Sequence, residues 1–186
     1  MRRTSVLATA ATILLGLGGS YAHAQARPTA ARAGDLQIGV GYVLAKPDYT
    51  EFRWKGPAIY ATFDFREHWG VEAEFHQVNI PNGLRYERTY EIGPRYVWHF
   101  GRYNPYAKVM IGRGVFNFAT DPTPNQPSVQ IANLAYNLYA FGGGMDVHVH
   151  KHVNVRVDYE MQQWMSFPPN GGLSPQLLTI GAAYHF

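Results

Sequence analysis

The chain has 186 residues, with 16 Lys and Arg against 13 Asp and Glu, and its formal net charge is +3. Arg2 and Arg3 lie in an amino-terminal leader, and removing their two charges from +3 leaves +1, which gives no support to nucleic-acid binding. There is no cysteine, so disulfides and a lipid-modified cysteine anchor are both excluded.

The leader is typical of a secretory signal peptide. Arg2 and Arg3 precede an apolar run at residues 6–18, and Ala22-His23-Ala24 places small residues at the spacing of a cleavage site. After the leader no long apolar run occurs, which excludes a helical membrane protein. We expect a signal peptide at residues 1–24, a periplasmic lead-in at 25–34 and one folded domain at 35–186.

The folded domain alternates between apolar residues and polar or small residues, with the period of two that β-strands have. In the last strand, Leu178, Ile180, Ala182 and Tyr184 alternate with Thr179, Gly181, Ala183 and His185. The pattern predicts eight strands, at residues 36–42, 59–65, 69–76, 91–100, 106–118, 134–149, 153–162 and 177–186.

The connections between these strands alternate in length. Long ones are expected at residues 46–55, 79–83, 119–133 and 166–175, and short turns lie between the other pairs. Short periplasmic turns and longer outer loops are typical of transmembrane β-barrels, and closure removes exposed strand edges. We therefore predict an all-β, eight-stranded antiparallel up-and-down transmembrane β-barrel with both mature termini in the periplasm.

This topology gathers aromatic residues at two levels, as expected of belts at the two membrane interfaces. One belt would contain Trp69, Trp98, Phe100 and Phe186, and the other would contain Trp54 and Trp164.

The chain resembles the small eight-stranded outer-membrane β-barrel family of the OmpA/OmpX type. The resemblance is carried by the alternating strands, Gly-Gly-Gly-Met-Asp at 142–146, Asp158-Tyr159-Glu160 and the terminal Phe186. It implies a location in the bacterial outer membrane and contact with outer-membrane lipid and lipopolysaccharide. It also implies assembly by the barrel-assembly machinery through the final strand ending at Phe186. The loop residues 48–55 and 84–88 mix aromatic side chains with both charges, which suits an extracellular partner, and the alternative is that they are solvated loops.

The face opposite the apolar one is charged. Its charged residues are Asp64, Glu72, Glu74, Glu91, Arg95, Lys108, Asp146, Arg156, Asp158 and Glu160. An eight-stranded barrel is narrow, so we expect these side chains to fill the lumen and to pair, because an unpaired buried charge is costly. The alternative is that they rearrange and let small ions through.

The fifth strand has an ambiguous phase. If Lys108 and Met110 face inward, Arg113 falls on the apolar face, which requires a β-bulge or an arginine that reaches to the interface.

The histidines raise the question of a metal site. On an ideal strand His148, His150 and His152 share one face, with His99 and His185 near the same end, and converging imidazoles can bind zinc or copper. The alternative is that they are solvated turn residues and polar fillers, and we expect no metal or other cofactor. No serine is paired with a histidine as nucleophilic catalysis requires, so no enzymatic activity is expected.

The sequence thus favours an integral outer-membrane protein with a plugged lumen and a structural or adhesion-like role. Two other functions stay open: a narrow channel for ions or small solutes, and a soluble periplasmic, lipocalin-like binder of an apolar ligand. The binder would have its apolar face inside, so the positions of Glu72, Glu74 and Phe75 distinguish it from a membrane barrel.

Overall fold

The computed structural model describes residues 34–48, 50–80, 85–119, 129–166 and 172–186. The expected signal peptide and all but the last residue of the expected lead-in lie outside these ranges. In the part of the chain that is described, no helix has the length and apolarity needed to cross a membrane.

The described residues form β-strands joined by loops and turns. The strands are β1 (Asp35–Lys46), β2 (Trp54–Asp64), β3 (Trp69–Asn79), β4 (Arg85–Val97), β5 (Tyr103–Ala119), β6 (Gln130–His150), β7 (Val153–Met165), β8 (Gly172–Leu173) and β9 (Gln176–His185). All eight predicted strands are present, and β2 and β6 begin inside stretches predicted to be loops. These two predictions were too short because backbone pairing continues wherever the neighbouring strand runs, whether or not the side chains are apolar.

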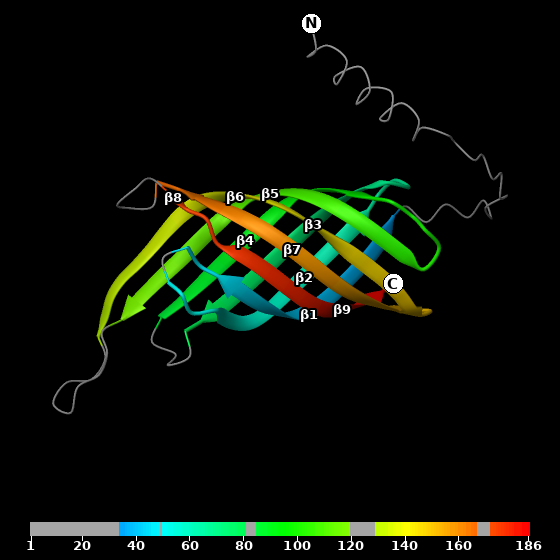
Figure 1. Ribbon diagram of the computed structural model, residues 1–186. Coiled ribbons are helices and arrows are strands. Elements are labelled where there is room, and N and C mark those ends of the chain that lie inside the picture. Colours follow the sequence, from blue (N-terminus) through cyan, green and yellow to red (C-terminus); the bar gives the residue numbers. More distant parts are fainter. Residues whose placement is uncertain (1–33, 49, 81–84, 120–128, 167–171) are drawn as a thin grey trace, which may run out of the picture. The chain divides into compact units, whose positions relative to one another are not determined.

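The strands form one antiparallel sheet that closes on itself. Each strand from β1 to β7 pairs with the next, and β9 completes the ring by pairing with β1 on one side and β7 on the other. Figure 1 shows β9 between β1 and β7, with all strands strongly tilted. The short β8 pairs with β7 just beyond the end of the β7–β9 ladder. The fold is therefore a closed eight-stranded barrel whose last strand is interrupted at Ser174 and Pro175, as the sequence predicted apart from the interruption.

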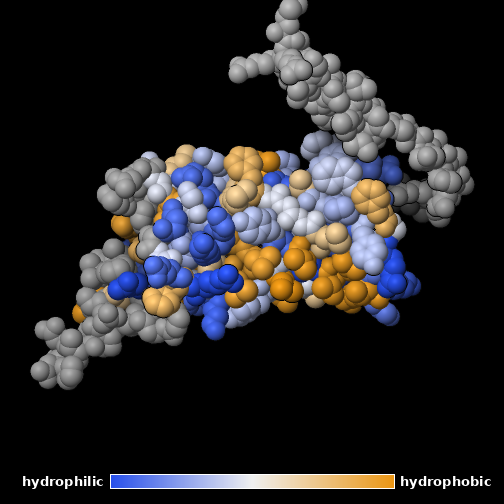
Figure 2. All heavy atoms as spheres, in the orientation of Figure 1, coloured by the Kyte–Doolittle hydropathy of each residue, from blue (hydrophilic) through white to orange (hydrophobic). Residues whose placement is uncertain are grey.

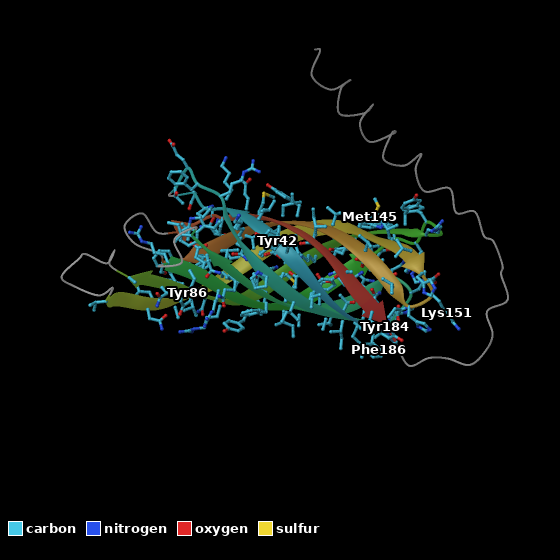
Figure 3. All side chains as sticks on the ribbon, turned by 90° about the horizontal axis from the view of Figure 1, so that it is seen from below. Tyr42, Tyr86, Met145, Lys151, Tyr184 and Phe186 are labelled. Carbon is cyan, nitrogen blue, oxygen red and sulfur yellow. The ribbon has the colours of Figure 1, made fainter. Side chains whose placement is uncertain are left out.

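The barrel has two different ends. The end that carries the connections β1–β2, β3–β4, β5–β6 and β7–β8 is called the loop end, and the end that carries the three short turns and the described chain ends is called the turn end. In Figure 3, Tyr86 lies toward the loop end, whereas Lys151, Tyr184 and Phe186 lie toward the turn end.

The side chains of the strands alternate between a buried inner face and an exposed outer face. In β3, Glu72 and Glu74 are buried, whereas Trp69 and Val71 are exposed and Phe75 is half-buried on the outer face against Tyr90. Figure 2 shows apolar side chains covering part of the outer surface, with hydrophilic ones gathered toward both ends. Because the charges are inside and the apolar side chains outside, the lipocalin-like arrangement is wrong.

Candidate functional site

The charged residues of the inner face meet inside the barrel. Nine of the ten expected residues are buried, and the tenth, Asp64, has a side chain that is 13% exposed. Five strands supply most of them, β3, β4, β5, β6 and β7, and every inward position follows from the two-residue period of its strand.

Two arginines, one from β4 and one from β7, share their acidic partners. Glu72 Oε2 accepts hydrogen bonds from Arg95 Nη1 at 2.8 Å and from Arg156 Nη1 at 2.7 Å. Asp146 accepts two from Arg156, at 2.7 and 2.9 Å, and one from Arg95 Nη2 at 3.0 Å. Paired bonds between a guanidinium and a carboxylate are strong and directional. The four residues therefore tie β3, β4, β6 and β7 together across the lumen.

Tyrosine rings cover these guanidinium groups, and sequence reasoning missed them. Arg156 lies 4.1 Å from the ring centre of Tyr60, and Arg95 lies 4.5 Å from that of Tyr106. Such contacts favour a cation over a ring face. Both tyrosines occupy inward positions of their strands, so the alternation could have indicated them.

The ammonium group of Lys108 is surrounded by four carboxylates. Its Nζ lies 2.5 Å from Glu74, 3.0 Å from Asp158, 3.0 Å from Glu160 and 3.3 Å from Glu72. Since one positive charge serves four acids, this side of the lumen carries more negative than positive charge.

Gly142 and Gly144 give these side chains room. A Cβ at Gly142 would lie 2.8 Å from Lys108 Cε, and one at Gly144 would lie 2.8 Å from the hydroxyl of Tyr106. That hydroxyl donates a 2.6 Å hydrogen bond to Asp158. Gly142 and Gly144 are thus part of the inner packing, because a side chain at either position would collide with a member of the network.

His76 is a further buried member of the inner set. Its Nδ1 lies 3.2 Å from Thr89 Oγ1 and 3.5 Å from Glu91 Oε1, and its Nε2 lies 4.0 Å from Glu74 Oε2. Alternation places His76 on the same face as Glu72 and Glu74, so the signal was in the sequence although the predicted charge network omitted it.

Toward the loop end the interior becomes largely apolar, with Glu87 and Thr89 as buried polar residues of β4. Two buried clusters lie there and reach into the middle of the barrel: Val43, Ala45, Trp54, Ala58, Val78 and Leu177 form one, and Met110, Leu138, Ala140, Trp164 and Leu173 form the other. Trp54 is 1% exposed and Trp164 is 0% exposed. Their predicted place in an outer aromatic belt is therefore wrong, because both continue the inward phase of their strands.

The other four predicted belt residues point outward near the turn end. Trp69, Trp98, Phe100 and Phe186 are exposed. Tyr96 packs edge-on against both Trp69 and Trp98, with ring centres 5.0 and 4.9 Å apart. This cluster has the mixed apolar and polar character that suits a membrane interface.

The phase of β5 is settled by burial. Lys108 and Met110 are buried, Arg113 is exposed, and the ladder with β6 shifts register only between Phe118 and Ala119. Arg113 therefore reaches the outer surface without a bulge. It lines a shallow outer hollow together with Tyr90, Ile111, Asn137 and Tyr139.

The turn-end histidines do not form a metal site in the described residues. The register shifts between His148 and His150, so they do not keep the common phase of an ideal strand. His185 is bonded to Asp35, and His99 Nε2 lies 2.5 Å from the carbonyl oxygen of Glu67. The groups with metal-ligand spacing among these residues lie inside the barrel instead: Glu74, His76 and Glu160, and Glu72, Glu74 and Asp158.

The loop end presents a polar surface. A hollow there is lined by Lys46, Pro47, Asp48, Thr50, Glu51, Ser174 and Gln176. The Ser174 amide donates a 2.9 Å hydrogen bond to Asp48 Oδ2. Beside the hollow Phe52 is 69% exposed. Arg53 and Lys55, the second of which lies at the start of β2, are exposed too. This part of the loop end therefore combines an aromatic ring with positive charge.

Sequence comparison identifies the family. Residues 10–186 match the family described as the outer membrane protein beta-barrel domain. The chain belongs to this outer-membrane β-barrel family. No curated protein matches its sequence.

Solved structures of small outer-membrane β-barrels have the same fold. Ail, the attachment invasion locus protein of Yersinia pestis, was solved with the heparin analogue sucrose octasulfate and is 19% identical, with a TM-score of 0.57 over 82% of this chain and 99% of Ail. Neisserial surface protein A is 11% identical, with a TM-score of 0.60 over 83% of this chain and 97% of its own. OprG of Pseudomonas aeruginosa is 15% identical, with a TM-score of 0.56 over 83% and 96%. At these identities the likeness concerns the fold.

Proposed function

We propose that this outer-membrane β-barrel protein has a structural or adhesion-like role at the cell surface and does not conduct solutes. The observation that supports the proposal is the filled interior, where a charge network and two apolar clusters occupy the lumen. A lumen packed with paired charges leaves the outer face and the loop end as the surfaces available to partners.

The proposal also covers the export of the chain, its orientation in the membrane, its contact with lipid and its assembly. Residues 1–24 direct export, the termini face the periplasm, and the loop end faces outward. The exposed apolar face contacts lipid, Arg113 lies close to anionic head groups of lipopolysaccharide, and the strand ending at Phe186 is recognised by the barrel-assembly machinery.

Recording of single channels in planar bilayers tests the plugged lumen. The refolded chain is expected to give no discrete conductance steps.

A narrow channel is the second candidate function. It is favoured by the four acids around Lys108, which offer the ammonium group alternative partners. Regular conductance steps that change when Lys108 is replaced by Gln would overturn the plugged lumen in favour of the channel.

Binding to a sulfated glycan tests the adhesion-like role, and heparin is the probe because Ail was solved with a heparin analogue. Arg53→Gln with Lys55→Gln removes two exposed positive charges beside Phe52 and is expected to weaken binding of intact cells to immobilised heparin. The matched control is Arg66→Gln with Lys151→Gln, which removes two exposed charges in the turns. Equal loss in both variants, or no binding by the parent chain, would contradict this role for this part of the loop end.

A further inference from the structure

We infer that the barrel interior holds a binding site for a first-row divalent transition metal ion, with His76, Glu74 and Glu160 as ligands. These residues come from β3 and β7, and each offers one ligand atom within 4.8 Å of the other two. The site is separate from the loop-end surface, so it does not depend on the role proposed above.

The spacing of the donor atoms fits an ion better than a hydrogen bond. His76 Nε2 and Glu74 Oε2 are 4.0 Å apart, which is beyond hydrogen-bond distance. Two atoms that bind one ion at about 2.1 Å each can be separated by up to about 4.2 Å. Small side-chain movements would therefore complete the coordination.

The opposite side of the imidazole is already held in place. Thr89 Oγ1 lies 3.2 Å from His76 Nδ1, and Glu91 Oε1 lies 3.5 Å from it. Metal-binding histidines commonly donate their other ring N–H to an oxygen of this kind, which fixes the tautomer and the ring orientation. The amide of Gln162 donates to both Glu91, at 2.6 Å, and Glu160, at 2.9 Å.

The charge around the site calls for another cation. The two arginines contact Glu72 and Asp146, and Arg156 Nη1 also lies 4.0 Å from Glu74 Oε1. Lys108 is nevertheless the cation closest to Glu74, and it is also paired with Asp158 and Glu160. Glu91 Oε2 is buried and has no hydrogen-bond partner among the described residues. An unpaired buried oxygen of this kind costs free energy. A proton on His76 would offset one negative charge of the surrounding acids, whereas a divalent ion would offset two.

The donor set indicates the class of ion. One imidazole with carboxylates suits ions such as Zn²⁺ or Mn²⁺, whereas Mg²⁺ and Ca²⁺ prefer oxygen ligands alone. Lys108 keeps Asp158, at 3.0 Å, and Glu72, at 3.3 Å, as partners when Glu74 and Glu160 turn toward the ion.

The test uses the untagged chain, refolded in detergent after chelator treatment and titrated with Zn²⁺ alone. We expect a single tightly held ion after desalting, and Thr89→Val is expected to weaken binding by roughly 10-fold while keeping the shape of the side chain. His76→Gln should lose the ion, whereas His99→Gln, which alters an exposed histidine of the turn end, should keep it.

A measurement on the parent chain covers the case in which His76→Gln does not fold. With ¹⁵N-labelled histidine, Zn²⁺ is expected to shift the ring nitrogens of one solvent-protected histidine and to leave the others in place. Absence of a retained ion in the folded parent chain, shifts confined to solvent-exposed histidines, or equal binding by parent and His76→Gln would each overturn the inference.

Discussion

At the scale of single residues, Glu72 contacts three cations of the network, and no sequence pattern indicates these contacts. It is fully buried and touches Arg95, Arg156 and Lys108 at 2.8, 2.7 and 3.3 Å. Removing one member of a buried ion network leaves its partners charged and without compensation, which costs more free energy than the intact network contributes.

Glu72→Gln is therefore expected to lower the free energy of unfolding by about 3 kcal/mol. The measurement is the urea midpoint of the refolded barrel in lipid vesicles. Glu67→Gln is the control, because Glu67 is exposed in a turn and its replacement should change stability by less than about 0.5 kcal/mol. Equal effects of the two substitutions would show that the network contributes little.

At the scale of elements, the phase of each strand decides whether a side chain faces the barrel interior or the outer surface. Trp69 in β3 is exposed, whereas Trp164 in β7 is buried in the apolar cluster with Leu138 and Leu173. The alternation of residues 153–162, extended by two residues, places Trp164 inward beside Gln162. The alternation alone therefore predicts an inward Trp164, whereas the expected aromatic belt placed it on the outer face.

Fluorescence quenching by brominated lipids tests these phases. The chain has four tryptophans, so variants that keep one and replace the other three by Phe report on one position each. Emission from Trp69 is expected to be strongly quenched in brominated vesicles, because that ring faces lipid. Emission from Trp164 should change little, and quenching of both to the same degree would contradict an apolar cluster inside the barrel.

At the scale of the whole molecule, the barrel depends on closure by β9. Its ladders to β1 and β7 leave no free edge in the ring of long strands, and the Phe186 amide adds a 3.0 Å hydrogen bond to the Leu36 carbonyl. A membrane offers no water to unpaired backbone groups, so an open sheet would not be stable there.

The refolded chain is expected to stay folded in cold detergent and to change its gel mobility on boiling. Deleting residues 176–186 should abolish the mobility difference, because the edges of β1 and β7 are then both unpaired. Deleting Phe186 alone removes one hydrogen bond and should preserve the difference. A truncated chain that still shifts on boiling would contradict closure by β9.

The sequence by itself determined the strands, their antiparallel closure and the contrast between a charged inner face and an apolar outer face. These features follow from a two-residue period and from the alternation of loop lengths, both of which are local. The ten predicted charges were assigned to the inner face in this way, because a residue's parity within its strand fixes its face. Glu87, which is also buried and has the same parity as Glu91, was missed because the predicted strand began only at residue 91.

The tertiary structure alone decided which charges meet and where the interior becomes apolar. Arg156 reaches Glu72 across 84 residues of sequence, and His76 lies opposite Glu160 from another strand. Such pairs depend on the registers of several ladders and on the barrel's tilt, which no single strand encodes. Trp54 lies at the edge of a predicted loop, so its phase could not be assigned from the sequence. The pairing of β2 with β1 and β3 shows that Trp54 belongs to β2 and faces inward.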